Sequence, residues 1–293
     1  MAAHAALTQY LISGLTTGSV YALTALGYCL IYNATRVVNF AQGDFLRLGG
    51  LLLYSLLSGL NLPLIPAFAL AVAGTALAGA LMERLCLRPA RSRDLMVLIF
   101  ITVAASILGR GLMKTAWGKQ TLPLPPLSPE IPLRLAGAVF TPQNLWVLGI
   151  TLAAILALRH FFGRTLTGKA MRAMAANPRA ASLMGIDTRA VTTLSFALAG
   201  ALGGLTGILI TPITSLSCEV GVMLGLKGFA AAVLGGYGNF AWAVAGGLAL
   251  GLLESFGAGM LSSAYKDVLA FVVLLLVLFL RPQGLLGGKE GRS

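Results

Sequence analysis

Charged residues, histidine and cysteine are all scarce in this sequence. Only 10% of its 293 residues are charged, well below the roughly 25% of an average soluble domain. The two histidines, His4 and His160, are isolated, and the three cysteines, Cys29, Cys86 and Cys218, have no metal-ligand spacing. The sequence therefore predicts neither a bound metal nor histidine-based catalysis, and it offers no cysteine pattern that would indicate a disulfide framework.

Hydrophobic residues are abundant in their place. They make up 57% of the chain, and the mean hydropathy is +0.87, values that indicate an all-α polytopic membrane protein. The net charge of +12 comes from basic residues that collect in short loops, so we predict no nucleic-acid partner. The first 32 residues lack a charged n-region and a small-residue cleavage site, and we interpret them as a retained span.

Long apolar runs recur along the whole chain. They predict one transmembrane helix bundle of eight or nine spans, a single domain over residues 1–293. The second run and the two runs that flank residues 235–239 are short, so we expect broken or re-entrant helices there. The runs lie near residues 7–32, 45–60, 62–82, 95–113, 144–162, 191–212, 225–237, 240–259 and 265–280.

Basic loops predict the orientation of these spans. Arginine and lysine are concentrated in residues 83–94 and 159–190, and they occur again in the tail after residue 280. The positive-inside rule assigns all three segments, and therefore the C-terminus, to the cytoplasm. The proline-rich residues 121–132 then lie outside, as does the N-terminus if the second run crosses the membrane fully. The basic residues concerned are Arg84, Arg88, Arg91, Arg93, Arg159, Arg164, Lys169, Arg172, Arg179, Arg189, Arg281, Lys289 and Arg292.

Glycines at four-residue spacing predict close helix packing. Gly200 and Gly204, Gly203 and Gly207, and Gly247 and Gly251 form small-xxx-small pairs. Such pairs let helix backbones approach each other in a membrane, where lipid supplies no hydrophobic drive between helices. We therefore assign these glycines to packing rather than to contact with a ligand.

The stretch GRTLTGKAMRAMAANP, residues 163–178, has the glycine and lysine spacing of a phosphate-binding loop. That loop requires a Ser or Thr after the lysine to hold magnesium, whereas this chain has Ala170 after Lys169. The loop also follows a buried strand, whereas residues 144–162 form an apolar run long enough for a membrane helix. We therefore predict that the stretch binds no nucleotide.

Residues 163–190 form a long cytoplasmic loop that contains a short helix of about two turns. Asn177 is a preferred N-cap, Pro178 suits the first helical position, and Gly185 suits a left-handed stop. The segment PRAASLM between them has apolar and polar faces. Such a helix either lies on the lipid surface or docks into a groove of a partner.

The string GKAMRAMAANPRAASLMGID resembles the cytoplasmic coupling segment of the branched-chain amino acid ABC-transporter permeases, in particular the shorter, H-type subunit. The family resemblance extends over nearly the whole chain, through residues 14–45, 225–239, 246–255 and 281–287. It implies a permease subunit of an ATP-driven importer that carries branched-chain amino acids by alternating access. It further implies a bacterial-type plasma membrane, with this chain embedded in lipid.

The resemblance also implies the partners and their cofactors. These are two cytoplasmic ATP-binding subunits, a homologous second permease and an extracytoplasmic solute-binding protein. ATP and magnesium are expected on the partner subunits, no cofactor is expected on this chain, and the chain is expected not to be an enzyme. The residues expected to meet the ATPase are Asn177, Pro178, Arg179, Ala181, Met184 and Gly185.

The segment NFAQGDF interrupts an apolar pattern with polar side chains. Asn39, Gln42 and Asp44 either line a water-accessible translocation path or form a polar network between helices. The family usually has histidine at the position of Gln42 and an apolar residue at that of Arg47. An arginine one turn into a membrane helix lies at the interface or is functional.

Three other functions compete with this interpretation. A related ABC permease for another amino acid or a small amide such as urea would share the same motifs. An ion-coupled secondary transporter would need ionisable groups at membrane depth, for which Asp44, Glu254 and Asp267 are the acidic candidates. We assign Glu254 instead to a helix-end or interhelical contact. A membrane enzyme would need a clustered nucleophile, base or metal set, which the sequence does not offer.

Overall fold

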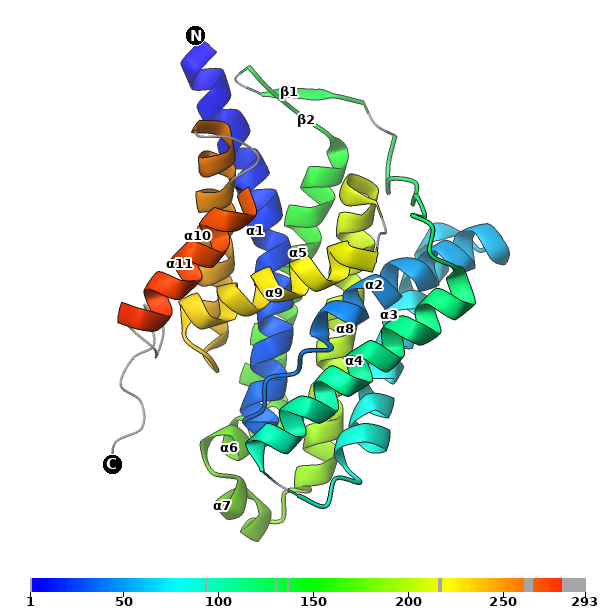
Figure 1. The fold of residues 1–293 in the computed structure, drawn as a ribbon, viewed down its shortest axis with the longest axis vertical. Helices are drawn as coiled ribbons and strands as arrows, with labels where there is room; N and C mark the ends of the chain where they lie inside the picture. Colours follow the sequence, from blue (N-terminus) through cyan, green and yellow to red (C-terminus); the bar gives the residue numbers. More distant parts are fainter. Residues whose placement is uncertain are drawn as a thin grey trace.

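The computed structural model describes residues 2–92, 94–129, 131–135, 137–215, 218–260 and 266–280. Each predicted apolar run coincides with a helix of the bundle drawn in Figure 1. These helices are α1 (Ala2–Thr35), α2 (Gln42–Tyr54), α3 (Leu64–Met82), α4 (Leu95–Trp117), α5 (Pro142–Arg164), α8 (Thr188–Thr214), α9 (Cys218–Gly235), α10 (Phe240–Met260) and α11 (Lys266–Leu280).

Six of the described helices are long and apolar enough to cross a membrane: α1, α3, α4, α5, α8 and α10. The helices α2, α9 and α11 are shorter, with 13, 18 and 15 residues. α2 continues into one π-helical turn, η1 (Ser55–Gly59), before the chain turns toward α3. The prediction of incomplete spans fits α2 and α9 but is wrong for α10, whose 21 residues give about 31 Å of continuous helix.

α1 and α8 form the centre of the bundle. In their most apolar windows, 89% and 72% of the residues are buried within the chain, against 11% for α4 and 17% for α5. A helix that is apolar all round and buried on every side belongs to a core, whereas α4 and α5 present leucine and isoleucine side chains at the surface of the bundle. The functional side chains described below lie between this centre and the surrounding helices.

Close helix contacts explain the predicted glycine pairs. A Cβ added at Gly207 of α8 would collide with the backbone carbonyl of Leu46 in α2, and one at Gly251 of α10 would collide with Gly18 in α1. These positions accept only glycine because backbone stands where a side chain would begin. The assignment of the glycines to packing is confirmed.

A short β-hairpin lies at one end of the bundle, a feature that the all-helical prediction omits. Strands β1 (Leu133–Leu135) and β2 (Ala138–Phe140) pair antiparallel, with Leu133 opposite Phe140. The Val139 amide donates to Gln9 Oε1 of α1 at 2.9 Å, which fixes the hairpin to the first helix. Figure 1 shows the hairpin at the opposite end from α6 and α7.

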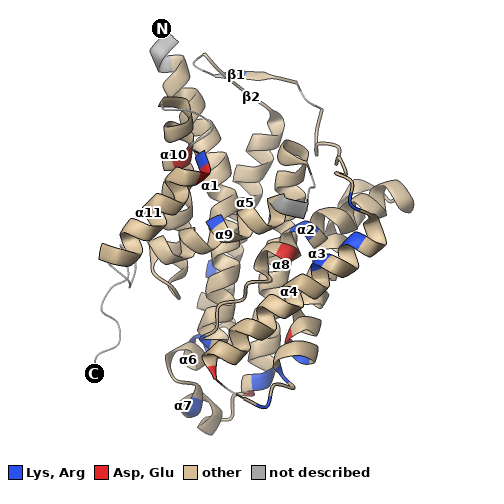
Figure 2. Cartoon of the chain, in the orientation of Figure 1, with Lys and Arg blue, Asp and Glu red and all other residues tan. Residues whose placement is uncertain are grey.

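The other end of the bundle carries the predicted basic loops. There α6 (Leu166–Ala176) and α7 (Pro178–Leu183) connect α5 to α8, and the π-helical turn η2 (Glu83–Leu87) extends α3. Part of the loop predicted over residues 83–94 is therefore helical. Blue basic residues gather at this end in Figure 2, while the basic tail after residue 280 lies outside the described residues.

Candidate functional site

The start of α7 is fixed by the two residues that the sequence predicts. The Asn177 side-chain oxygen Oδ1 accepts hydrogen bonds from the amides of Arg179 and Ala180, both at 3.1 Å. Pro178 occupies the first helical position, where a missing N–H loses no helical bond. The predicted N-cap is therefore confirmed.

The C-terminus of α7 is capped as well, by backbone hydrogen bonds. Gly185 is in the left-handed region with φ of +83°. The amides of Gly185 and Ile186 donate to the carbonyls of Ser182 and Ala181, both at 3.1 Å, which is the Schellman arrangement of a helix C-terminus. This six-residue helix thus satisfies its terminal backbone groups locally, and Met184 forms its C-cap.

The two faces of α7 differ from our expectation. We expected the small Ala181 side chain to face outward into a partner, but it is buried in the core of its own chain, because α7 rests on α6 and α8. The exposed side is formed by Leu183, which is 87% exposed, Met184, which is 83% exposed, and the exposed Arg179. Interaction surfaces often carry neighbouring apolar side chains that are exposed in this way.

The phosphate-loop pattern has no phosphate-loop geometry. Gly163 lies in the last turn of α5, whereas Gly168 and Lys169 lie in α6. The amide of Gly168 donates to Thr165 Oγ1 at 3.0 Å, and that of Lys169 donates to the Thr165 carbonyl at 3.1 Å. Because both amides already donate within the chain, they are not available to a phosphate.

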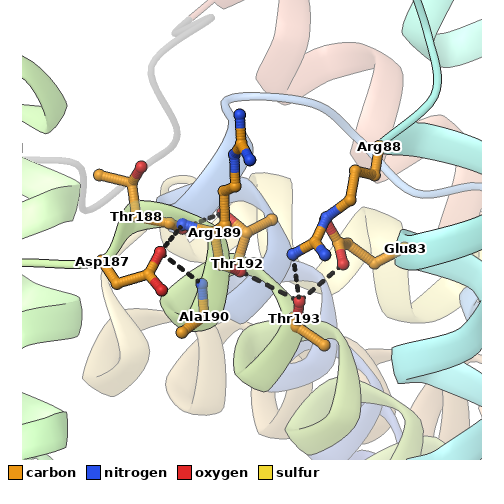
Figure 3. Close-up of polar contacts among 8 residues, drawn as sticks. All are labelled: Glu83, Arg88, Asp187, Thr188, Arg189, Ala190, Thr192 and Thr193. Carbon is orange, nitrogen blue, oxygen red and sulfur yellow. Dashed lines mark hydrogen bonds and ion pairs between the residues drawn. The ribbon is translucent and has the colours of Figure 1, made fainter.

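A polar joint connects α7 to the membrane helices. Asp187 caps α8 by accepting from the amides of Arg189 and Ala190 at 2.9 and 3.1 Å. In the second turn of α8, the Thr193 hydroxyl donates to Glu83 Oε2 of η2 at 2.7 Å. Figure 3 shows these contacts side by side.

The same joint includes Arg88, just beyond η2. Its Nη2 donates to Thr193 Oγ1 at 3.3 Å, and its Nε lies 3.6 Å from Glu83 Oε1. The ends of α8 and α3 are therefore held together directly behind the loop that carries α7.

Asn39 and Gln42, two of the three predicted path residues, are sealed between helices. The Gln42 amide Nε2 donates to the Ala199 carbonyl of α8 at 2.9 Å, and Asn39 Oδ1 accepts from the Ala41 amide at 3.1 Å. Both side chains are fully buried. The Gln42 bond joins α2 to α8, whereas the Asn39 bond is local to the turn that precedes α2.

Asp44, the third predicted path residue, has different surroundings. It borders a pocket of about 160 Å³ that lies between α1, α2, α4 and α9. Ser106 of α4 donates a short hydrogen bond to Asp44 Oδ2, and Arg110 Nε lies 3.6 Å from Asp44 Oδ1. Arg110 and Ser106 were not among the predicted site residues, although an arginine inside the apolar run 95–113 was a visible signal.

Arg47 is buried in the chain rather than exposed at its surface. Its Nε and Nη1 atoms have no hydrogen-bond partner among the described residues. It lies beside a small crevice of about 10 Å³ whose lining includes Thr211 and Thr214 of α8, about the space of a single water molecule.

A second group of charges, which we call the ion cluster, joins α9, α10 and α11. Lys227 Nζ lies 2.7 Å from Glu254 Oε1 and 2.6 Å from Asp267 Oδ1, and Lys266 Nζ lies 3.2 Å from Glu254 Oε1. Tyr21 of α1 donates to Glu254 Oε2 at 2.6 Å. The predicted interhelical role of Glu254 is confirmed. Lys227 was missed, although it interrupts the apolar run 225–237.

Comparisons with known proteins identify the family. The branched-chain amino acid transport system permease component family matches residues 10–278. BraD of Pseudomonas aeruginosa, a high-affinity branched-chain amino acid transport system permease protein, is 32% identical over 295 residues and covers 96% of each chain. LivH of Escherichia coli, described in the same words, is 32% identical over 297 residues with the same coverage.

A solved structure resembles this chain in fold, and a more distant relative resembles part of it in sequence. PsaBC from Streptococcus pneumoniae in complex with Fab matches with a TM-score of 0.53 at 15% identity, over 95% of this chain and 92% of that one, a likeness of fold. RbsC of Escherichia coli, a ribose import permease protein, is 32% identical over 145 residues, 46% of this chain and 44% of its own. The chain is therefore a member of the branched-chain amino acid transport system permease family, an integral membrane transport subunit rather than an enzyme.

Proposed function

We propose that this chain forms the membrane path of an ATP-driven importer for branched-chain amino acids. It works with two cytoplasmic ATP-binding subunits, which hold ATP and magnesium, with a homologous second permease, and with an extracytoplasmic solute-binding protein. It binds no cofactor and no nucleic acid itself. The printed names of BraD and LivH, each matched over 96% of this chain, support the solute class.

The observation that carries the coupling role is the construction of α7. Six residues closed by a cap at each end form a rigid unit, and its outer face presents Leu183 and Met184 almost fully exposed. A helix this short has little stability of its own, so the caps and the inward-facing Ala181 must hold it in place. Such a unit fits a groove on an ATP-binding subunit.

A movement of α7 passes readily to the membrane helices. The chain runs from Gly185 through the Asp187 cap directly into α8, and Thr193 and Glu83 join α8 to the end of α3. On α6, the Ala175 carbonyl accepts from Arg36 Nη2 at the end of α1, at 2.5 Å. Closure of the ATP-binding subunits would thus displace α1, α3 and α8 together, as alternating access requires.

The charge distribution supports the sidedness of the proposal. Basic residues gather around α6, α7 and η2 (Figure 2), and cytoplasmic loops of membrane proteins are enriched in lysine and arginine. The coupling loop therefore faces the cytoplasm in a bacterial-type plasma membrane, and the C-terminus lies on the same side.

The test replaces the exposed pair in the reconstituted complex. We expect Leu183→Ser combined with Met184→Ser to lower solute-stimulated ATP hydrolysis and uptake about tenfold, because apolar anchors dominate such interfaces. Ile65→Ser is the matched control, because Ile65 is 83% exposed, like the α7 pair, but lies at the start of α3, at the opposite end of that helix from η2. A photo-crosslinker at position 183 should capture the ATP-binding subunit. Normal coupling in the double variant, with crosslinks to lipid alone, would contradict the proposal.

A further inference from the structure

The pocket beside Asp44 is lined by one acidic and one basic side chain and otherwise by mostly apolar residues. Its polar side is formed by Asp44 of α2 with Ser106 and Arg110 of α4. Its apolar walls include Val103 of α4 and Leu226 of α9. At about 160 Å³ it offers roughly ten times the space that one water molecule requires. Resting on the proposed function, we propose that this pocket is the membrane binding site for the transported amino acid in its zwitterionic form.

The charged atoms of the pocket have bonding capacity to spare. Both contacts of Arg110, to Asp44 Oδ1 at 3.6 Å and to the Ser106 carbonyl at 3.4 Å, use Nε. Its two terminal nitrogens can therefore receive a carboxylate in bidentate geometry. A carboxylate has about four acceptor sites, and Asp44 uses one for Ser106 and one for the longer contact with Arg110, so it can also accept an ammonium group.

Charge balance selects the class of ligand. The pocket contributes one negative and one positive group, and a zwitterion brings one of each in a complementary arrangement. A ligand with an amine alone would bring no carboxylate for Arg110. A ligand with a carboxylate alone would bring no ammonium group for Asp44. An unpaired charge is expensive away from bulk water, so the site favours the zwitterion over either singly charged analogue.

The walls favour an aliphatic side chain. Val103, Val222, Leu226 and Phe40 are half-buried and border the pocket together with Gly43 and Gly225. A Cβ on Gly225 would lie 3.0 Å from the Gly43 Cα, so α2 and α9 approach closely there. A branched apolar group can therefore pack against valine and leucine side chains while its charged end faces Asp44 and Arg110.

Substrate protection of a cysteine in the pocket tests the proposal. Val103→Cys, in a Cys86→Ser and Cys218→Ser background, is labelled with a small aqueous thiol reagent in nanodisc-embedded permease with its ATP-binding subunits. We expect leucine to slow the labelling, whereas 4-methylpentanoate and 3-methylbutylamine at the same concentration should protect about tenfold more weakly, because each lacks one charge-assisted contact. Equal protection by all three compounds would overturn the zwitterion site.

Variants of the charged residues separate binding from structure. Arg110→Gln should weaken protection by leucine about tenfold while labelling by reagent alone is unchanged. Lys114→Gln, an exposed charge one turn further along α4, should leave protection intact. Undiminished protection in Arg110→Gln would show that Arg110 only ties α4 to α2. A failure of the proposed function would appear instead as wild-type complex without leucine-stimulated ATP hydrolysis, before any variant is compared.

Discussion

The ion cluster and the Asp44–Arg110 pair place opposite charges among apolar helices, but only the Lys227–Glu254 pair within the cluster is sealed. The Lys227 and Glu254 side chains are 6% and 1% exposed and touch at 2.7 Å. Those of Arg110 and Asp44 are 33% and 11% exposed and lie 3.6 Å apart beside a pocket. A pair of opposite charges can therefore either hold helices together or remain open to a ligand, depending on whether a pocket lies beside it.

The physical difference lies in how many partners each charge already has. Glu254 has three close partners, Lys227, Lys266 and the Tyr21 hydroxyl. Asp44 has one close partner, Ser106, and the longer 3.6 Å contact with Arg110. Lys227 also lies 5.7 Å from the centre of the Tyr21 ring, a cation–π distance. The sealed group is a structural tie between four helices, whereas the open pair retains capacity for a ligand.

The largest effect is expected from breaking the sealed group. Glu254→Gln removes the buried one of the two carboxylates that balance Lys227 and Lys266, so we expect a loss of about 3–5 kcal/mol of unfolding free energy. Denaturant titration in mixed micelles measures it. Asp267→Asn is the control, because the Asp267 side chain is 52% exposed and should matter less. A Glu254→Gln protein as stable as wild type would end the structural interpretation.

A smaller loss is expected when both members of the buried pair are replaced. Lys227→Met with Glu254→Leu leaves no uncompensated charge at the centre, and apolar replacements of buried ion pairs are often close to neutral. We expect the double variant to lose about 1–2 kcal/mol, less than Glu254→Gln alone. If it is instead less stable than the single variant, the cluster contributes more than charge balance. The same micelle titration compares the two.

The open pair should matter little for stability and much for transport. Asp44→Asn keeps the shape of the side chain and can still accept from Ser106, so we expect about 1 kcal/mol or less of destabilisation. Leucine uptake per ATP hydrolysed, measured in proteoliposomes, should fall by about tenfold because the ammonium partner is lost. A variant that loses stability and uptake in proportion would place this pair with the sealed group.

The smallest effect on stability is expected from replacing Arg179 on α7, which serves as a reference for a solvent-exposed charge. It is exposed and makes no ion pair among the described residues. Arg179→Ala should change the unfolding free energy by less than about 0.5 kcal/mol. Any rim contact with the ATP-binding subunit contributes about 1 kcal/mol or less. A loss of coupling as severe as that in the Leu183 and Met184 variant would show that the charge, not the apolar pair, anchors α7.

Much of the helical architecture could be predicted because its causes are local. Apolar run length is a property of consecutive residues, and so each predicted run coincides with a helix. Helix caps are equally local: Asn177 bonds to amides two and three residues away, and Gly185 supplies its own backbone conformation. The β-hairpin was missed because three-residue strands have too few residues for an alternating pattern to be recognised.

The candidate site was predicted only in part. Asn39, Gln42 and Asp44 are close in sequence and equally polar, yet Gln42 bonds to α8 while Asp44 faces a pocket with α4. Their partners, Ala199 and Arg110, are 157 and 66 residues away along the chain. No local pattern encodes such pairings.

The sequence by itself determined that this chain is a helical membrane protein, where its helices run, how α7 begins and ends, and to which family it belongs. Those properties depend on composition, on short-range hydrogen bonds and on motif order. Only the tertiary structure decided that Ala181 points inward, that Lys227 and Glu254 are sealed together, and that Asp44 and Arg110 share a pocket. These outcomes depend on which helices meet, because burial and charge pairing arise between segments distant in the chain.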